Sequence, residues 1–128
     1  MYIDGFSGFS VDDTERARQF YADVVGLDVT TGAMAGLINL HLPGGGEVLV
    51  YPKGEAHTPA TFTVLNLVVP DIDATVAELS SRGVAFLHYD GEIRTDDSGV
   101  HRGTPTLAWF ADPAGNVVSI IERDGEGT

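Results

Sequence analysis

The side chains best able to do chemistry in this sequence are isolated polar groups within apolar runs. Asn39 and His41 are two residues apart in the apolar run 37–42, so a strand there would point both side chains to one face. Histidine titrates near neutral pH, which makes His41 a candidate general acid or base and a candidate ligand contact. The alternative interpretation is an ordinary, partly exposed strand histidine.

Standard catalytic motifs are missing from the sequence. The chain has no cysteine, which excludes disulfides, thiolate nucleophiles and cysteine-based zinc sites. It has no phosphate-binding loop and no nucleophile elbow, and the glycine run 44–46 is interpreted as a turn. Six further titratable side chains in or near expected loops are interpreted as solvated: His57, His88, His101, Asp96, Asp97 and Asp124.

Two segments of the chain repeat one design, and they must position these polar groups. Residues 6–29 and residues 64–86 each run through a β-type stretch, an acidic helix start, an amphipathic stretch, a glycine and a second apolar run. An internal repeat of this kind predicts two related modules.

Each repeat contains one predicted helix. In the first repeat, Asp12 and Glu15 have the spacing of a capping box, and Gly26 ends the helix. The second repeat predicts a helix over about residues 71–82, closed by Gly83. The apolar stripe of the first helix consists of Ala17, Phe20, Tyr21, Val24 and Val25.

Each half also carries a hairpin signal, and together these elements predict the fold. Residues 90–105, which are rich in Asp, Gly and Ser, are expected to form a long loop. We predict an α+β fold in a single domain, 1–128, with module 1 over about 1–52, a linker over 53–60 and module 2 over about 61–124. The hairpin strands are 37–42 and 47–51 around the loop 43–46, and 106–110 and 116–122 around the loop 112–115.

The charge of the chain limits its partners. Seven basic and 19 acidic residues give a net charge of −12, which opposes binding to nucleic acid and to anionic membranes. No apolar run approaches the roughly 20 residues that span a bilayer. Since the first residues also lack the features of a signal peptide, we expect a cytoplasmic location. The charge favours a cationic ligand, although a well-solvated surface is the simpler interpretation.

Three stretches resemble signatures of the vicinal oxygen chelate superfamily, which includes glyoxalases, bleomycin resistance proteins and extradiol dioxygenases. Residues 11–27 resemble its first-module signature, residues 69–73 with 82–84 resemble the second, and residues 110–116 resemble its aspartate-proline-x-glycine-asparagine turn. The resemblance implies two βαβββ modules whose mixed sheet forms a cup, and it implies a homodimer. It says little about activity, because this scaffold carries isomerases, dioxygenases, thiol transferases and non-catalytic drug-binding proteins.

The resemblance also implies four metal-ligand positions, usually histidine or glutamate. In this sequence they fall on Phe6, Val50, Val64 and Ser119. Phenylalanine and valine offer no ligand atom, and a lone serine hydroxyl is a poor ligand for a divalent cation. We therefore expect no metal and no cofactor in the cup.

Strand alternation predicts which side chains line the cup. If residues 43–46 form the first hairpin loop, His41 pairs with Val48 and Asn39 pairs with Val50, and paired residues share a face. The expected lining is apolar and aromatic with a few separated polar groups, as in many small-molecule pockets. The predicted ligand-binding residues are Phe6, Ser10, Asn39, His41, Val50, Val64, Asn66, Trp109 and Ser119.

These observations favour a small-molecule binding protein that sequesters an apolar, aromatic or cationic compound without a metal. The alternative is a glyoxalase-like lyase or isomerase, or a dioxygenase-related enzyme, with a non-standard site. That site would use His41 as its acid or base, or a metal bound by His41, Tyr51 and Glu122, although strand parity points Glu122 away from the face of Ser119. A third possibility is an interaction module whose cup is filled by side chains.

Overall fold

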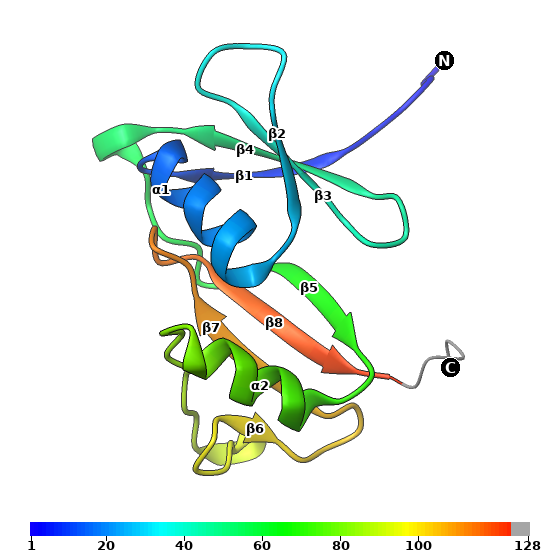
Figure 1. Ribbon diagram of the computed structural model, residues 1–128, viewed down its shortest axis with the longest axis vertical. Helices are drawn as coiled ribbons and strands as arrows, with labels where there is room; N and C mark the ends of the chain where they lie inside the picture. The colour runs from blue at the N-terminus through cyan, green and yellow to red at the C-terminus, as the bar shows by residue number, and fades with distance from the viewer. Residues whose placement is uncertain (124–128) are drawn as a thin grey trace. The chain divides into compact units, whose positions relative to one another are not determined.

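The chain forms two compact units, and each unit is one βαβββ module (Figure 1). The first unit is Met1–Pro59 and the second is Ala60–Thr128. The computed structural model describes residues 1–123, so Asp124 lies outside the described residues. The α+β fold with two repeated modules, predicted from the sequence, is confirmed.

The elements of the two units follow the same order. The first unit contains β1 (Ser7–Val11), α1 (Thr14–Gln19), η1 (Phe20–Val25), β2 (Asp28–Thr31), β3 (Ile38–His41), β4 (Glu47–Pro52) and η2 (Gly54–Ala56). The second unit contains β5 (Thr63–Val69), α2 (Ile72–Ser81), η3 (Gly91–Ile93), β6 (Val100–His101), β7 (Leu107–Ala111) and β8 (Val117–Glu122).

Each unit has its own four-stranded mixed sheet. The strand orders are β1-β4-β3-β2 and β5-β8-β7-β6, so the first strand of each module pairs with the last. This first pairing is parallel, and the other pairings are antiparallel hairpin-type contacts. The equal strand order is the structural counterpart of the sequence repeat.

The helical segment of the first unit starts one residue later than its capping-box pattern predicts. The N-cap is Asp13, whose carboxylate accepts hydrogen bonds from the backbone N–H groups of Glu15 and Arg16, at 2.9 and 3.3 Å. Asp12 instead accepts from the N–H of Asp13. After α1 the backbone widens into the π-helical η1, and Gly26, at φ 90°, ends it in the left-handed conformation expected for a helix-ending glycine.

The helix of the second unit agrees with its sequence pattern. Asp71 is the N-cap and accepts a hydrogen bond from the N–H of Ala74, as a cap residue does. Glu122, at the end of β8, accepts a second bond from the first helical N–H, that of Ile72, at 2.9 Å. A carboxylate at this position complements the positive end of the helix.

The second strand position of the second module differs from that of the first. The apolar run 83–86 makes only an isolated bridge, between Phe86 and Phe110, followed by a bond from the Leu87 N–H to the Trp109 carbonyl. The chain then leaves the edge of β7 and returns to it as β6. The long loop predicted over 90–105 is therefore wrong in part, because this segment contains η3 and β6.

The core of each unit lies between its sheet and its helix. Alternate residues of β1, β3 and β4 are buried in the first unit. In the second unit, alternate residues of β7 are buried, together with Leu65 of β5 and the consecutive residues Val118, Ser119 and Ile120 of β8. Helix α2 lies across β7 and β8 (Figure 1) and buries Ile72, Val76 and Leu79. No helix within residues 1–123 is long and apolar enough to cross a membrane.

The turn between β7 and β8 is held by two buried polar side chains. Asp112 accepts hydrogen bonds from the N–H groups of Ala114 and Asn116, at 2.9 and 2.8 Å. Asn116 also donates to Asp112 and accepts from the N–H of Ala60. The aspartate-proline-x-glycine-asparagine sequence therefore has a structural role, since it sets the register of the β7–β8 pair.

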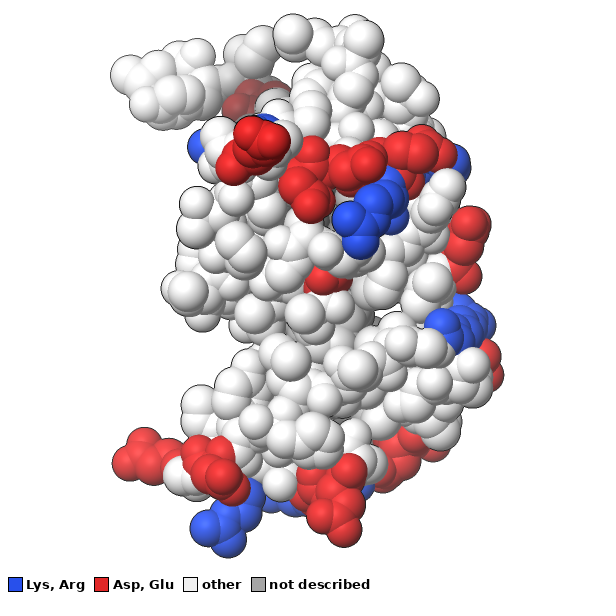
Figure 2. Space-filling view, turned by 90° about the vertical axis from the view of Figure 1, so that its left-hand side faces the viewer, with Lys and Arg blue, Asp and Glu red and all other residues white. Residues whose placement is uncertain are grey.

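The surface reflects the excess of acidic residues. In the face drawn in Figure 2, acidic side chains outnumber basic ones, and the basic ones lie beside acidic ones. The ion pairs of the described chain agree with this picture: they join Arg16, Arg18, Arg82 and Arg102 to nearby carboxylates.

Candidate functional site

The first hairpin has a different register from the one predicted, and this changes which residues share its faces. The observed pairs are Asn39 with Leu49 and His41 with Glu47. The loop is one residue shorter than expected, because the N–H of Leu42 already bonds to the carbonyl of Gly46, at 2.8 Å. A shift of one residue moves every side chain of β4 to the other face.

Val50 is therefore a core residue, and its prediction as a cup-lining residue is wrong. It is fully buried and pairs with Ile38 and Phe9, which are also buried. Leu49 takes its place on the open face, by which we mean the face of each sheet that lies away from its helix. Leu49 is half-buried there and pairs with Asn39 and Gly8.

His41 is on the open face of the first sheet, at the end of the hairpin, with both ring nitrogens engaged. Its Nδ1 lies 3.1 Å from Oε1 of Glu47, and its Nε2 lies 2.7 Å from the hydroxyl of Thr30 on β2. The side chain is 31% exposed. A carboxylate on one nitrogen and a hydroxyl on the other orient the imidazole, as an acid–base residue requires.

The other predicted residues of the first unit have separate environments. Ser10, on the open face of β1, is hydrogen-bonded to Nδ1 of His57, at 2.8 Å, so His57 is not a simply solvated loop histidine. Asn39 is half-buried between β2 and β4. Phe6 precedes β1 and is 72% exposed.

The four family positions for metal ligands do not fit a metal ion. The pairing of Gly8 with Leu49 in the first sheet corresponds to the pairing of Asn66 with Ser119 in the second. The fourth position therefore moves from Val50 to Leu49, which is again aliphatic. Within residues 1–123, no group of three or more His, Asp or Glu side chains is arranged to hold a metal ion. The set at these positions is then Phe6, Leu49, Val64 and Ser119, which supplies a single hydroxyl oxygen.

The second sheet brings three of the predicted residues together in one row across its open face. Asn66 on β5 pairs with Ser119 on β8, and Ser119 pairs with Trp109 on β7. The Ser119 hydroxyl donates a hydrogen bond to Oδ1 of Asn66, at 2.5 Å. Ser119 is buried, whereas Asn66 is exposed and Trp109 is half-buried. Val64 lies beside this row at an irregularity of the β5–β8 pairing.

Two aromatic residues that were not predicted to belong to the site, Tyr89 and His101, lie close to Trp109. Tyr89 contacts it edge to face with ring centroids 5.4 Å apart, and His101 lies at 6.3 Å. His101 was assigned to a loop but belongs to β6, where its Nδ1 is 2.9 Å from the carbonyl of Arg94. The only sequence signal for β6 was a single apolar residue, Val100, between Gly99 and His101, which is too brief to reveal a strand. We call Asn66, Ser119, Trp109, Tyr89 and His101 the aromatic row.

Glu122 belongs to the opposite face, as its parity predicted. It pairs with Val69, three residues beyond the Asn66–Ser119 pair, and its carboxylate caps α2. It therefore has a structural partner on the helix-covered face of the sheet.

The comparison with family models identifies one family. The model of the Glyoxalase/Bleomycin resistance protein/Dioxygenase superfamily matches residues 5–120. Among curated proteins, none matches the chain significantly.

Solved structures with the same fold have varied names. TnmS3, an antibiotic binding protein from Streptomyces sp. CB03234, is 24% identical with a TM-score of 0.66, over 97% of this chain and 99% of that one. A glyoxalase/bleomycin resistance protein from the same organism is 26% identical with a TM-score of 0.61, over 91% and 99%. Lactoylglutathione lyase from Agrobacterium tumefaciens is 19% identical with a TM-score of 0.67, over 94% and 92%. A protein named as an antibiotic binding protein and one named as a lyase thus share this fold.

Proposed function

The chain belongs to the Glyoxalase/Bleomycin resistance protein/Dioxygenase superfamily, and from that premise we propose that it is a small-molecule binding protein that holds an aromatic ligand without a metal ion. The observation that carries the proposal is the aromatic row on the open face of the second sheet. Because family membership alone does not distinguish binding from catalysis, the chemistry of this row must support the choice.

The aromatic row offers both an apolar ring surface and a hydrogen-bond donor to a ligand. Trp109 and Tyr89 present large rings that remain partly exposed, and such rings bind flat apolar groups with little loss of conformational freedom. Asn66 adds an exposed amide whose Oδ1 already accepts from Ser119, so its NH₂ group can donate to a ligand. Exposed apolar side chains on the same face, such as Val68 at 47%, extend the surface.

Two further observations support a binding role. The family's ligand positions offer no set of metal-binding side chains, so the metal-dependent chemistry of the family has no counterpart at those positions. In addition, TnmS3 has the same fold and is named as an antibiotic binding protein. We therefore propose an aromatic natural product, such as an antibiotic, as the ligand class, and the net charge of −12 favours a cationic one.

Trp109 makes the proposal directly testable, because it is the only tryptophan of the chain. Titration with aromatic antibiotics, including metal-free bleomycin, should change the Trp109 emission for at least one compound and raise the melting temperature. Trp109→Leu should weaken binding of that compound by about thirtyfold, measured calorimetrically. The control Phe62→Leu changes an exposed aromatic residue outside the row and should leave affinity unchanged.

Two results would overturn the proposal. One is the absence of any emission change or thermal shift across the antibiotic panel. The other is a large, saturable thermal shift with Fe²⁺, Mn²⁺, Ni²⁺ or Zn²⁺ that EDTA reverses, since this would reveal a metal site.

The contacts of His41 support a second candidate, a lyase or isomerase that uses this histidine as general acid or base. Glu47 and Thr30 orient its ring, and a positioned base accelerates a reaction by about 10²–10⁴-fold. His41→Ala should then reduce turnover of an identified substrate by at least this factor while Glu47→Gln reduces it less. Unchanged turnover in His41→Ala would discard the candidate.

A further inference from the structure

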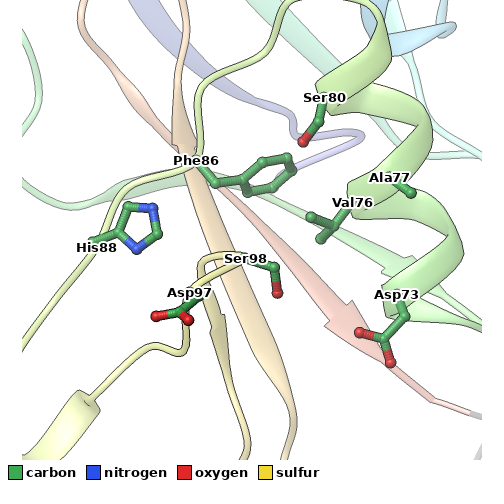
Figure 3. Close-up of a pocket in the computed structure, with 8 residues that line it drawn as sticks. All are labelled: Asp73, Val76, Ala77, Ser80, Phe86, His88, Asp97 and Ser98. Atoms are coloured by element: carbon green, nitrogen blue, oxygen red, sulfur yellow. The ribbon is translucent and has the colours of Figure 1, made fainter.

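A cavity lies on the helix-covered side of the second sheet, between α2 and residues 88–99, the segment leading into β6 that we call the excursion (Figure 3). It has a volume of about 320 Å³, which is at the lower end of the range for small-molecule sites, roughly 300–1,000 Å³. Helix α2 contributes Asp73, Val76 and Ala77 to its lining, and the excursion contributes Asp97 and Ser98. The cavity is separate from the aromatic row, because α2 covers the opposite face of the sheet.

The floor of the cavity is apolar and aromatic. Phe86 is buried, packs edge to face on Phe110 with centroids 5.6 Å apart, and points its ring toward Val76 on the helix (Figure 3). Ala77 leaves room beside it because its side chain is a single methyl group. This floor suits the hydrocarbon part of a ligand.

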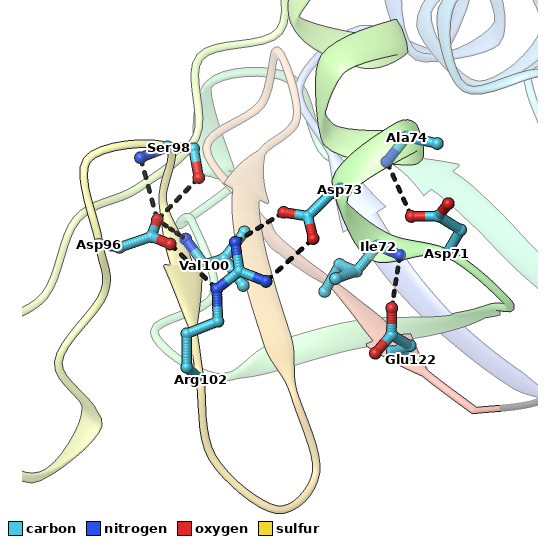
Figure 4. A network of polar contacts seen from close by, with 9 residues as sticks. All are labelled: Asp71, Ile72, Asp73, Ala74, Asp96, Ser98, Val100, Arg102 and Glu122. Carbon is cyan, nitrogen blue, oxygen red and sulfur yellow. Dashed lines mark hydrogen bonds and ion pairs between the residues drawn. The ribbon is translucent and has the colours of Figure 1, made fainter.

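The excursion is tied to the helix by a network of charged hydrogen bonds (Figure 4). Asp96 accepts from the N–H groups of Ser98 and Val100, at 2.9 and 3.0 Å, and from Nε of Arg102, at 3.1 Å. The two terminal nitrogens of Arg102 then bind both oxygens of Asp73 on α2, at 3.0 and 2.6 Å. Arg102 therefore bridges the two walls of the cavity.

This geometry determines the protonation states of Asp96, Asp73 and Arg102. Hydrogen bonds from Val100 and Ser98, together with Arg102, hold the pKa of Asp96 well below its ordinary value. The hydrogen bonds from Arg102 lower the pKa of Asp73, and its two carboxylate partners raise the pKa of Arg102. All three groups are thus charged at neutral pH and keep the walls in place.

Close packing also holds the excursion against the floor. Gly99, at φ 92°, brings its backbone so near that an added Cβ would lie 2.7 Å from Cβ of Phe86. Only glycine allows this approach. The cavity wall is therefore a built feature of the fold and not a passing arrangement of an exposed loop.

The lining of the cavity favours a positively charged ligand. It contains no lysine or arginine, and only His88 can acquire a positive charge. The carboxylate of Asp73 is shared with Arg102, but that of Asp97, an exposed residue of the lining, accepts none of the hydrogen bonds of the described chain. An ammonium group placed near Asp97 would have its hydrocarbon part against Phe86 and Ala77, within reach of the aromatic ring.

We propose that this cavity is a second ligand site, which binds a small organic amine with an aromatic or aliphatic body. Asp97 pairs with the ammonium group, and Phe86, Val76 and Ala77 contact the body. The site is independent of the aromatic row, so either one can fail while the other stands.

Phenethylamine is a suitable probe, with 2-phenylethanol as its neutral counterpart. Both are titrated into the full chain at about pH 8, where histidine side chains are generally uncharged, and the backbone amide resonances are followed by NMR. The amine should shift the amides of Ala77, Asp97 and Ser98 saturably, and it should bind about two- to fivefold more tightly than the alcohol, as expected for an exposed ion pair.

Two variants and one control sharpen the test. Asp97→Asn should reduce the affinity for the amine to that for the alcohol, whereas Glu55→Gln, the same charge change on an exposed residue of the first unit, should not. Ala77→Phe fills the cavity from an exposed helix position and should abolish binding of both probes while the spectrum keeps its native dispersion. Equal affinity for amine and alcohol, shifts confined to the surroundings of Trp109, or no saturation up to about 10 mM would overturn the proposal.

Discussion

The Ser119 hydroxyl on β8 donates a hydrogen bond to Oδ1 of Asn66 on the parallel strand β5, and the two side chains differ sharply in exposure. Ser119 is 1% exposed, whereas Asn66 is exposed to solvent. Water can thus replace the partner of Asn66 but not the partner of Ser119. Removing this hydrogen bond by mutating Asn66 should therefore lower the free energy of unfolding more than removing it by mutating Ser119.

This asymmetry leads to a prediction for stability. Asn66→Ala leaves the buried Ser119 hydroxyl without its acceptor and should cost about 1–3 kcal/mol. Ser119→Ala leaves only an exposed amide oxygen and should cost about 0.5 kcal/mol. Urea unfolding measures both values, and a larger loss for Ser119→Ala would contradict the described pair.

The register of the first hairpin can be tested at two adjacent residues. Val50→Ala opens a cavity in the core and should lower the free energy of unfolding by about 2 kcal/mol. Leu49→Ala removes more carbon atoms but from the half-buried open face, so it should cost about 1 kcal/mol or less. The reverse order of these two values would support the register expected from the sequence.

We predict that position 99 needs glycine for close packing as well as for its backbone conformation. Gly99→Ala combines an unfavourable φ of 92° with a clash against Phe86 and should destabilise the chain by about 2–4 kcal/mol. Gly91 is the matched control, because its φ is 93° and nothing lies within 4 Å of an added Cβ. Gly91→Ala should cost about 1 kcal/mol, and equal melting temperatures for the two variants would remove the packing argument.

Because of its hydrogen bonds, Asp96 should make the free energy of unfolding depend on pH. Its pKa is lower in the folded chain than its ordinary value of 3.8, so the unfolded chain binds a proton first as the pH falls. The stabilisation is complete above about pH 5 and is lost progressively as the pH drops through the ordinary pKa toward the lower, folded pKa.

Urea unfolding at about pH 6 and pH 3 measures this effect. Asp96→Asn should lose less stability between the two pH values than the unchanged chain, by the order of 1 kcal/mol because the group is partly exposed. Asp97→Asn removes the neighbouring carboxylate, which accepts none of the described hydrogen bonds, and serves as the control. If Asp96→Asn loses as much stability between the two pH values as the unchanged chain does, Asp96 does not have this role.

Much of the fold was predictable because its signals are local. The helix over about 71–82 was placed from its spacing and its terminal glycine, and it is observed as Ile72–Ser81. The side of Glu122 relative to Ser119 followed from parity alone, and it is confirmed. The absence of metal-ligand residue types at three of the four family positions likewise depends only on which residues the chain contains.

The errors concern features that depend on how distant segments meet. Val50 was assigned to the wrong face because a hairpin loop one residue shorter inverts the whole strand, and the residue types of 43–46 fit either loop. His101 and Tyr89 were missed because β6 has only two residues and is held by its pairing with β7. The cavity beside α2 had no sequence signal at all.

By itself, then, the sequence determined the two βαβββ modules and their helices, because these follow from periodicity and turn residues over short spans. The family resemblance added which residue types stand at the family's metal positions. The tertiary structure alone decided the register of β4, the aromatic row and the wall that Arg102 ties to Asp73. Their physical reason is shared: strand pairing and close packing are set by contacts between residues far apart in the chain, and a shift of one residue reverses which side chains meet.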